Sequence, residues 1–166
     1  MKRVLVILWV MVLAVAIVVP IASAADDMAA KLNAVLSKST EAKFWQVSAD
    51  EVLSMINEKK TDFVVVDVRP NPSEFAAGHI PGAIQITVQD IFKPENLKKL
   101  PKNKKLILAC VTGQTQNLPV VGLRVLGYNA YTMAFGYAAW TKGYRGGVIM
   151  QEAIQNAAAK SYPISK

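Results

Sequence analysis

The most reactive side chain in the sequence is its single cysteine. Cys110 ends the apolar run 106–110, and the loop Val111-Thr112-Gly113-Gln114-Thr115-Gln116 follows it. An apolar run of this kind predicts a buried parallel strand, and ligand sites of open α/β sheets lie at the carboxyl ends of such strands. We expect the thiol to face successive backbone N–H groups and the start of a helix over residues 117–126, both of which favour the thiolate. A buried structural cysteine is the alternative.

The surrounding elements alternate between strands and helices. Strands are predicted over residues 44–47, 62–69, 84–86, 106–110 and 130–133. A capping box at Ser48 and Glu51 predicts a helix after the first strand, and further helical segments are expected over 73–77, 117–126 and from 136. This order predicts an α/β fold, with one parallel sheet covered by helices on both faces.

The N-terminus has the features of a secretory signal peptide. Lys2 and Arg3 precede an uninterrupted apolar run over residues 4–19, and Ala22-Ser23-Ala24 supplies a small-x-small cleavage site. We therefore expect residues 1–24 to be a signal peptide and the protein to be exported, in the first place to a periplasm. The alternative is an uncleaved N-terminal helix, which is the one route by which we expect contact with a membrane.

The rest of the chain is divided by its patterning into an N-terminal helical extension (25–43), a main domain (44–148) and an alanine-rich helical tail (149–166). Without Lys2 and Arg3 the formal charge falls from +7 to +5. The remaining lysines gather in turns, so nucleic acid is not an expected partner. One cysteine excludes an internal disulfide, and one cysteine with one histidine does not make the usual metal-ligand set. We expect no metal and no cofactor.

Three stretches carry a family resemblance. They are Val66-Asp67-Val68-Arg69, the run from Glu74 to Ala83 that contains Gly78-His79-Ile80-Pro81-Gly82, and the Cys110 loop. Their order and spacing resemble the rhodanese-like single-domain sulfurtransferases over residues 45–142. The resemblance implies a sulfurtransferase in which Cys110 takes a sulfane sulfur from a donor, holds it as a persulfide and passes it to a thiophilic acceptor.

The same resemblance implies the roles of other residues. The loop around the sulfur would bind the substrate, with Gly113 allowing the tight turn and the Thr115 hydroxyl donating to sulfur. Its members are Val111, Thr112, Gly113, Gln114, Thr115 and Gln116. The expected partners are a small sulfane-sulfur donor, a thiol or cyanide acceptor, and in some pathways a protein acceptor.

Asp67 and Arg69 match the Asp-x-Arg pattern of the family. Arg69 could guide an anionic donor, while a structural interpretation pairs it with Glu74 to fix the following turn; we assign Asp67 and Glu74 to structural support. His79 lies in a Gly/Pro turn that favours a hydrogen-bonded structural histidine.

Two departures from the family bear on function. Val111 and Thr112 are neutral where members specialised for thiosulfate carry basic residues, which argues against thiosulfate as the natural donor. Gln116 stands where the related Cys-x5-Arg phosphatases need an arginine to clamp a phosphoryl group, which disfavours phosphatase chemistry. The alternative to an enzyme is a rhodanese-fold sulfur-carrier or binding module with little turnover that serves a partner protein.

Overall fold

The computed structural model describes residues 24–165, so the expected cleavage site and the segment before it lie almost entirely outside the described residues. The chain divides into two compact units, one ending at Lys38 and one beginning at Ser39. In the first unit, residues 24–36 form a helix. No helix among the described residues is both long enough and apolar enough to cross a membrane.

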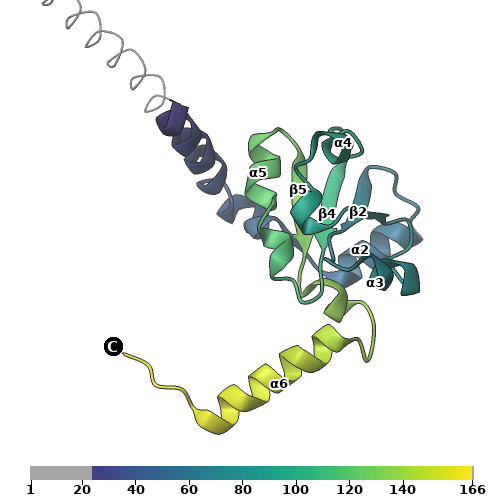
Figure 1. Cartoon of the computed structure of the whole chain (residues 1–166), viewed down its shortest axis with the longest axis vertical. Coiled ribbons are helices and arrows are strands. Elements are labelled where there is room, and N and C mark those ends of the chain that lie inside the picture. The colour runs from purple at the N-terminus through teal and green to yellow at the C-terminus, as the bar shows by residue number, and fades with distance from the viewer. Residues whose placement is uncertain (1–23, 166) are drawn as a thin grey trace, which may run out of the picture. The chain divides into compact units, whose positions relative to one another are not determined.

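The second unit contains one sheet of five parallel strands in the order β1-β5-β4-β2-β3 (Figure 1). The strands are β1 (Gln46–Val47), β2 (Phe63–Asp67), β3 (Ile84–Gln85), β4 (Lys105–Ala109) and β5 (Asn129–Met133). β4 lies between β2 and β5, so its carboxyl end is the centre of one edge of the sheet. The predicted α/β fold with a parallel sheet is confirmed.

The helices connect these strands. The α-helices are α2 (Ala49–Asn57), α3 (Pro72–Ala77), α4 (Pro94–Leu97), α5 (Val120–Val125) and α6 (Arg145–Lys160). Four short 3-10 helices complete the unit: η1 (Thr40–Trp45), η2 (Val88–Asp90), η3 (Thr115–Asn117) and η4 (Gly136–Ala139). The capping box is present as predicted, with Ser48 and Glu51 exchanging hydrogen bonds at the start of α2.

The core lies on both faces of the sheet because side chains alternate along each strand. Val65 of β2 and Ile107 of β4 pack in one buried cluster with Val52 of α2. Their neighbours Val66 and Leu108 are equally buried and point to the opposite face, where α5 packs beside β5. Figure 1 shows α5 and α2 on opposite sides of the sheet, which confirms the expected two-sided cover.

Three expected boundaries change. The first strand begins at Gln46, because Phe44 and Trp45 adopt positive φ angles in η1 and cannot continue a strand. The helix expected over 117–126 begins only at Val120, after a 3-10 turn. The expected boundary at residue 148 falls inside α6, which is exposed from residue 151 onward.

Candidate functional site

Cys110 directly follows β4 at the carboxyl edge of the sheet. Its side chain is buried, with an exposed fraction of 1%. β2 runs parallel beside β4, with Asp67 opposite Ala109. The topology therefore brings Asp67, Arg69 and Cys110 to the same edge, as parallel strands require.

The loop after Cys110 leaves its backbone donors free. Within residues 24–165, no backbone or side-chain acceptor receives a hydrogen bond from the N–H groups of residues 111–116. Gly113 turns the chain with φ +85°, and the Asn117 side chain closes the loop by donating to the Gly113 carbonyl at 2.7 Å. Backbone N–H groups in a folded protein normally find an acceptor. A run of free ones around a tight turn is an arrangement suited to binding an anion.

The loop is most accessible at two of its six residues. Val111, Thr112 and Gly113 are partly buried, while Gln114 and Thr115 are exposed. A small molecule can therefore reach the loop from the side of Gln114 and Thr115. The Thr115 hydroxyl has no hydrogen-bond partner among the described residues, and it is free to contact a ligand.

Gln116 has a different position from the other loop residues, because its side chain is buried between two strands. Its Oε1 accepts the Cys110 N–H at 2.7 Å, and its Nε2 donates to the Met133 carbonyl. The amide thus joins the end of β4 to the end of β5 and fixes the backbone from which the loop departs. The sequence predicted Gln116 as a substrate contact through its backbone N–H, which has no acceptor among the described residues. Its side-chain amide contacts the protein backbone, and we assign that amide a positioning role.

η4 packs against the loop from the other side. The Tyr137 N–H donates to the Cys110 carbonyl at 2.7 Å, and the Ala138 N–H donates to the Val111 carbonyl at 3.1 Å. A Cβ on Gly136 would lie 2.5 Å from the Cys110 carbonyl oxygen, and one on Gly113 would lie 2.8 Å from the backbone of Phe135. Both positions also have positive φ, so a glycine is required at each. The Gly136 contact is long-range, and the sequence did not indicate it.

Arg69 is paired with Asp67, and the expected pair with Glu74 is wrong. The Arg69 Nε and Nη2 donate to the Asp67 carboxylate at 2.7–3.0 Å, and Nη2 also donates to the Gly78 carbonyl at 2.7 Å. The guanidinium lies 4.0 Å from the centre of the Tyr137 ring. Burial alone lowers the pKa of Arg69, but hydrogen bonds to Asp67 and Tyr144 outweigh it and the net pKa is raised.

These contacts bear on the second expectation for Arg69, which was to guide an anionic donor. The side chain is 1% exposed and its charge is balanced by an adjacent buried carboxylate. Neither feature suits the attraction of a solute from water. We therefore assign Arg69, with Asp67, to the support of the turn that follows β2.

Glu74 joins α3 to the start of α6. Its carboxylate accepts from the Tyr144 hydroxyl and from the Arg145 guanidinium, each at 2.7 Å. Burial alone raises the pKa of Glu74, whereas these two hydrogen bonds lower it, and the net shift is downward. The supporting role expected for Glu74 is retained with partners 70 and 71 residues further along the chain, which local sequence patterns did not reveal.

The structure also places His79 and the helix that follows the Cys110 loop. His79 stacks on Phe75 at 3.9 Å and its Nδ1 lies 3.0 Å from the Phe75 carbonyl oxygen, as expected for a structural histidine. α5 begins at Val120, ten residues after Cys110, and the 3-10 turn Thr115–Asn117 stands between the loop and this helix. In the part of the chain that the structure describes, no three His, Cys, Asp or Glu side chains are grouped to hold a metal ion.

Comparison with known proteins gives relatives of the same fold. A rhodanese-like domain protein from Staphylococcus aureus has 31% sequence identity and a TM-score of 0.52; the similarity covers 59% of this chain and 93% of that one. A tRNA uridine(34) hydroxylase from Buchnera aphidicola subsp. Acyrthosiphon pisum is 40% identical over 73 residues, 40% of this chain and 21% of the relative.

A tRNA sulfurtransferase from Desulfurococcus amylolyticus is 32% identical over 82 residues, 49% of this chain and 16% of the relative. The chain thus spans about a fifth or less of the length of these two curated relatives. The family model described as "Rhodanese-like domain" matches residues 48–143, which contain four of the five strands, the Asp67–Arg69 pair and the Cys110 loop. The chain therefore belongs to the rhodanese-like domain family.

Proposed function

We propose that this protein is a sulfurtransferase that moves a sulfane sulfur from a donor, through a persulfide on Cys110, to a thiophilic acceptor. The observation that carries the proposal is the loop of residues 111–116, whose N–H groups have no acceptor among the described residues and which directly follows Cys110. Sulfur-transfer chemistry is also in the name of one relative.

The loop suits both steps of such a transfer. In the first step the Cys110 thiolate attacks the outer sulfur of the donor, the donor S–S bond breaks, and the leaving group departs with the electron pair. In the second step the acceptor attacks the outer sulfur of the persulfide, and Cys110 leaves as the thiolate. Each step is a substitution at sulfur with no net oxidation. An anionic sulfur is present throughout, and fixed N–H donors stabilise it without reorganisation.

The donor that we propose is a persulfide or polysulfide of low charge. Val111 and Thr112 carry no charge, and Arg69, the arginine of the Asp-x-Arg pattern, is already paired with Asp67. Thiosulfate is a dianion that gains most from a cation beside the thiolate. A loop that offers only amides lacks that contribution.

A turnover assay separates this function from the alternative of a sulfur carrier. With a persulfide donor and cyanide, an enzyme releases thiocyanate over many cycles, and Cys110→Ser releases none. A carrier module loads one sulfur and stops after about one equivalent unless its partner protein is added. Thiocyanate formation by Cys110→Ser at the wild-type rate contradicts both functions.

The exposed α6 is the feature that favours a partner protein as acceptor. Its residues from 151 onward are exposed, and its start contacts the sulfur loop where Gly146 packs against Val111. A stimulation of turnover by one added protein, lost when α6 is shortened after Gln155, would support the carrier function over the general sulfurtransferase.

We also propose that the protein is exported after cleavage behind Ala24, most simply to a periplasm. The support is the order of charge, apolar run and Ala22-Ser23-Ala24 in the sequence. N-terminal sequencing of the protein from an expressing cell decides between the two forms. A first residue of Ala25 supports cleavage, and Met1 in the membrane fraction supports the anchored form.

A further inference from the structure

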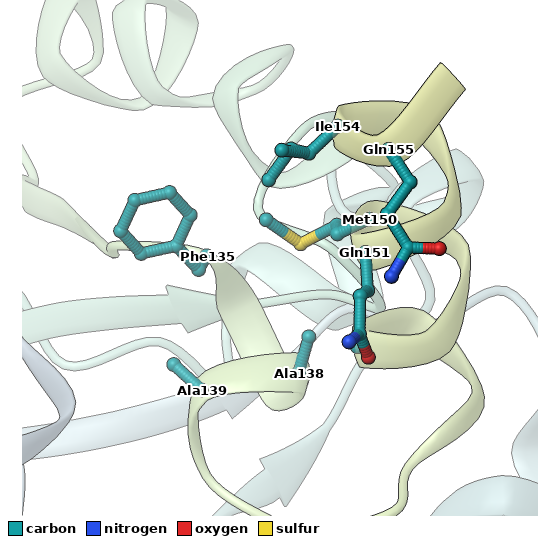
Figure 2. A pocket seen from close by; sticks show the side chains of 8 residues that line it. Phe135, Ala138, Ala139, Met150, Gln151, Ile154 and Gln155 are labelled. Atoms are coloured by element: carbon teal, nitrogen blue, oxygen red, sulfur yellow. The ribbon is translucent and has the colours of Figure 1, made fainter. Parts of the chain in front are cut away.

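A hollow with a volume of about 550 Å³ lies between η4 and α6. Figure 2 shows it lined by Phe135, by two alanines of η4 and by side chains that project from α6. Pockets that bind small organic ligands have volumes of roughly 300–1,000 Å³. The hollow is therefore large enough for the organic group of a small substrate.

One face of α6 forms a wall of this hollow. The wall residues follow the spacing i, i+3, i+4, i+7 and i+8, which places them on one side of the helix. They are Gly147, Met150, Gln151, Ile154 and Gln155. Met150 and Ile154 extend from the helix towards the ring of Phe135 (Figure 2), and both Ile154 and Phe135 are more than half exposed. The face combines two apolar side chains with two carboxamides, and from residue 151 onward it is exposed.

The hollow adjoins the sulfur loop through its backbone. Phe135 contacts Gly113 so closely that no Cβ fits between them, and Gly146, just before the wall residue Gly147, lies equally close to the Val111 carbonyl. The Ala138 N–H donates to that same carbonyl. The residues that wall the hollow are therefore in direct backbone contact with the sulfur loop.

The lining indicates the chemistry of the ligand. None of the eight lining residues is ionisable, and the adjacent loop residues Val111 and Thr112 are neutral. An ionised group in such surroundings loses hydration without gaining a partner. Gln151 and Gln155 lie one helical turn apart and offer two carboxamides that can hydrogen-bond to a neutral polar atom.

We propose that this hollow binds the uncharged organic group of the sulfur donor, an aryl or branched-alkyl group attached to the sulfane sulfur. The proposal rests on the proposed sulfurtransferase function and adds a binding site and a substrate class to it. For an organic persulfide, the Cys110 thiolate attacks the terminal sulfur, the S–S bond breaks, and the organic thiolate leaves with the electron pair. Cys110 is left as the persulfide, and the organic thiolate departs from the hollow.

A matched pair of donors tests the site. Benzenethiosulfonate and methanethiosulfonate carry the same single charge and release a sulfinate by the same S–S cleavage, and they differ in the organic group. With cyanide as acceptor, we expect kcat/KM for the benzene compound to exceed that for the methane compound about tenfold, after each is corrected for its uncatalysed reaction with a small thiol. A gain of this size is at the lower end of what apolar pockets provide.

Two isoleucines of α6 provide a variant and its control. Ile154→Asn places an amide in the hollow and should lower the benzene-to-methane ratio about threefold. Ile149 is half exposed on the opposite side of the helix and does not line the hollow. Ile149→Asn makes the same kind of change outside the hollow and should leave the ratio unaltered.

The outcomes separate this proposal from the function on which it rests. A ratio near one, with turnover that depends on Cys110, overturns the binding site and leaves the sulfurtransferase intact. If neither donor is used, turnover with a persulfide donor and cyanide decides the sulfurtransferase, and NMR titration of the wild type with benzenesulfinate and methanesulfinate decides the site alone. Shifts of the Met150 and Ile154 methyl signals with benzenesulfinate only support the site, and equal or absent shifts overturn it.

Discussion

Two polar clusters lie side by side at the carboxyl ends of β2 and β4, and their hydrogen bonding is opposite. At the end of β2 the Asp67 carboxylate and the Arg69 guanidinium are buried against each other and against the Gly78 carbonyl. At the end of β4 the six N–H groups after Cys110 have no acceptor within the described residues. The first cluster is closed, whereas the second is open to a ligand.

The difference shows which polar residues can do chemistry. The sequence offered two candidates for contact with an anion, the N–H groups after Cys110 and the charge of Arg69. A buried charge that is already paired has little left to offer a substrate. Free backbone donors carry no formal charge, but they are fixed in place and oriented before the substrate arrives. We therefore place the reaction at the open cluster and the stability of the turn at the closed one.

The largest effect is expected from breaking the closed cluster. Arg69→Leu leaves the Asp67 carboxylate buried without a partner and should lower the free energy of unfolding by about 3–5 kcal/mol, measured by denaturation with urea. Combining Arg69→Met with Asp67→Leu should recover most of that loss, since an apolar pair of similar volume replaces the ions.

A milder variant tests whether Arg69 also acts on the donor. Arg69→Lys keeps the charge and loses the two-pronged geometry. Thiosulfate turnover per folded molecule should match the wild type. A selective rise in KM for thiosulfate would show that the closed cluster does contact the donor.

The next effect concerns the charge of the open cluster. Val111→Arg combined with Thr112→Lys adds cations beside the thiolate and should raise kcat/KM for thiosulfate by roughly tenfold to a hundredfold, the equivalent of ~1.5–3 kcal/mol for charge-assisted hydrogen bonds. Added salt should reduce the gain. Efficient use of thiosulfate by the wild type, with no gain in the double variant, would show that the amides alone are sufficient.

A smaller effect is expected at the amide that fixes the loop. Gln116→Leu leaves the Cys110 N–H and the Met133 carbonyl without their partner and should destabilise the protein by ~1–3 kcal/mol. It should also lower sulfur transfer per folded molecule, because the start of the loop is released. Gln114→Leu is the matched control, since Gln114 is exposed and its side chain makes no hydrogen bond to another residue of the described chain. Equal effects of the two variants would remove Gln116 from its positioning role.

The smallest effect is a pH dependence at the junction of α3 and α6. The lowered pKa of Glu74 means that its contribution to stability is complete above the ordinary value of 4.5 and is lost as the pH falls through the lowered pKa. Half of the Arg145 side chain is exposed, so we expect only ~0.5–1 kcal/mol. Glu74→Gln should remove the contribution of Glu74 to the pH dependence of urea unfolding below pH 4.5. An unchanged dependence of the unfolding free energy on pH would contradict a stabilising role for the contacts of Glu74 with α6.

Features with a local cause were predictable from the sequence. The Ser48–Glu51 capping box spans four residues, and the apolar composition of β4 predicts a buried strand. The position of Cys110 at the sheet edge then follows from the rules for parallel sheets. The Asp67–Arg69 pair also has a local cause, because residues i and i+2 of an extended chain point to the same side. The expected pair of Arg69 with Glu74 of α3 is less local than the pair that forms.

Features with a distant cause were not predictable in this way. The contact of Gly136 with the Cys110 carbonyl, the bond from Tyr144 to Glu74 and the insertion of Gln116 between β4 and β5 all depend on how separate elements dock. The hydrophobic periodicity of a sequence does not predict contacts between separate elements. The hollow beside α6 belongs to the same class, since its two walls meet only in the folded unit.

The most direct test of the central claim is the intact mass of the protein after exposure to a persulfide donor and removal of excess reagent. The open cluster predicts a gain of ~32 Da, one sulfur atom, on the wild type, and its loss when cyanide is added. The Cys110→Ser variant should gain nothing. A wild type that never gains the sulfur, or a Cys110→Ser variant that gains it equally, would contradict the assignment of Cys110 as the sulfur carrier.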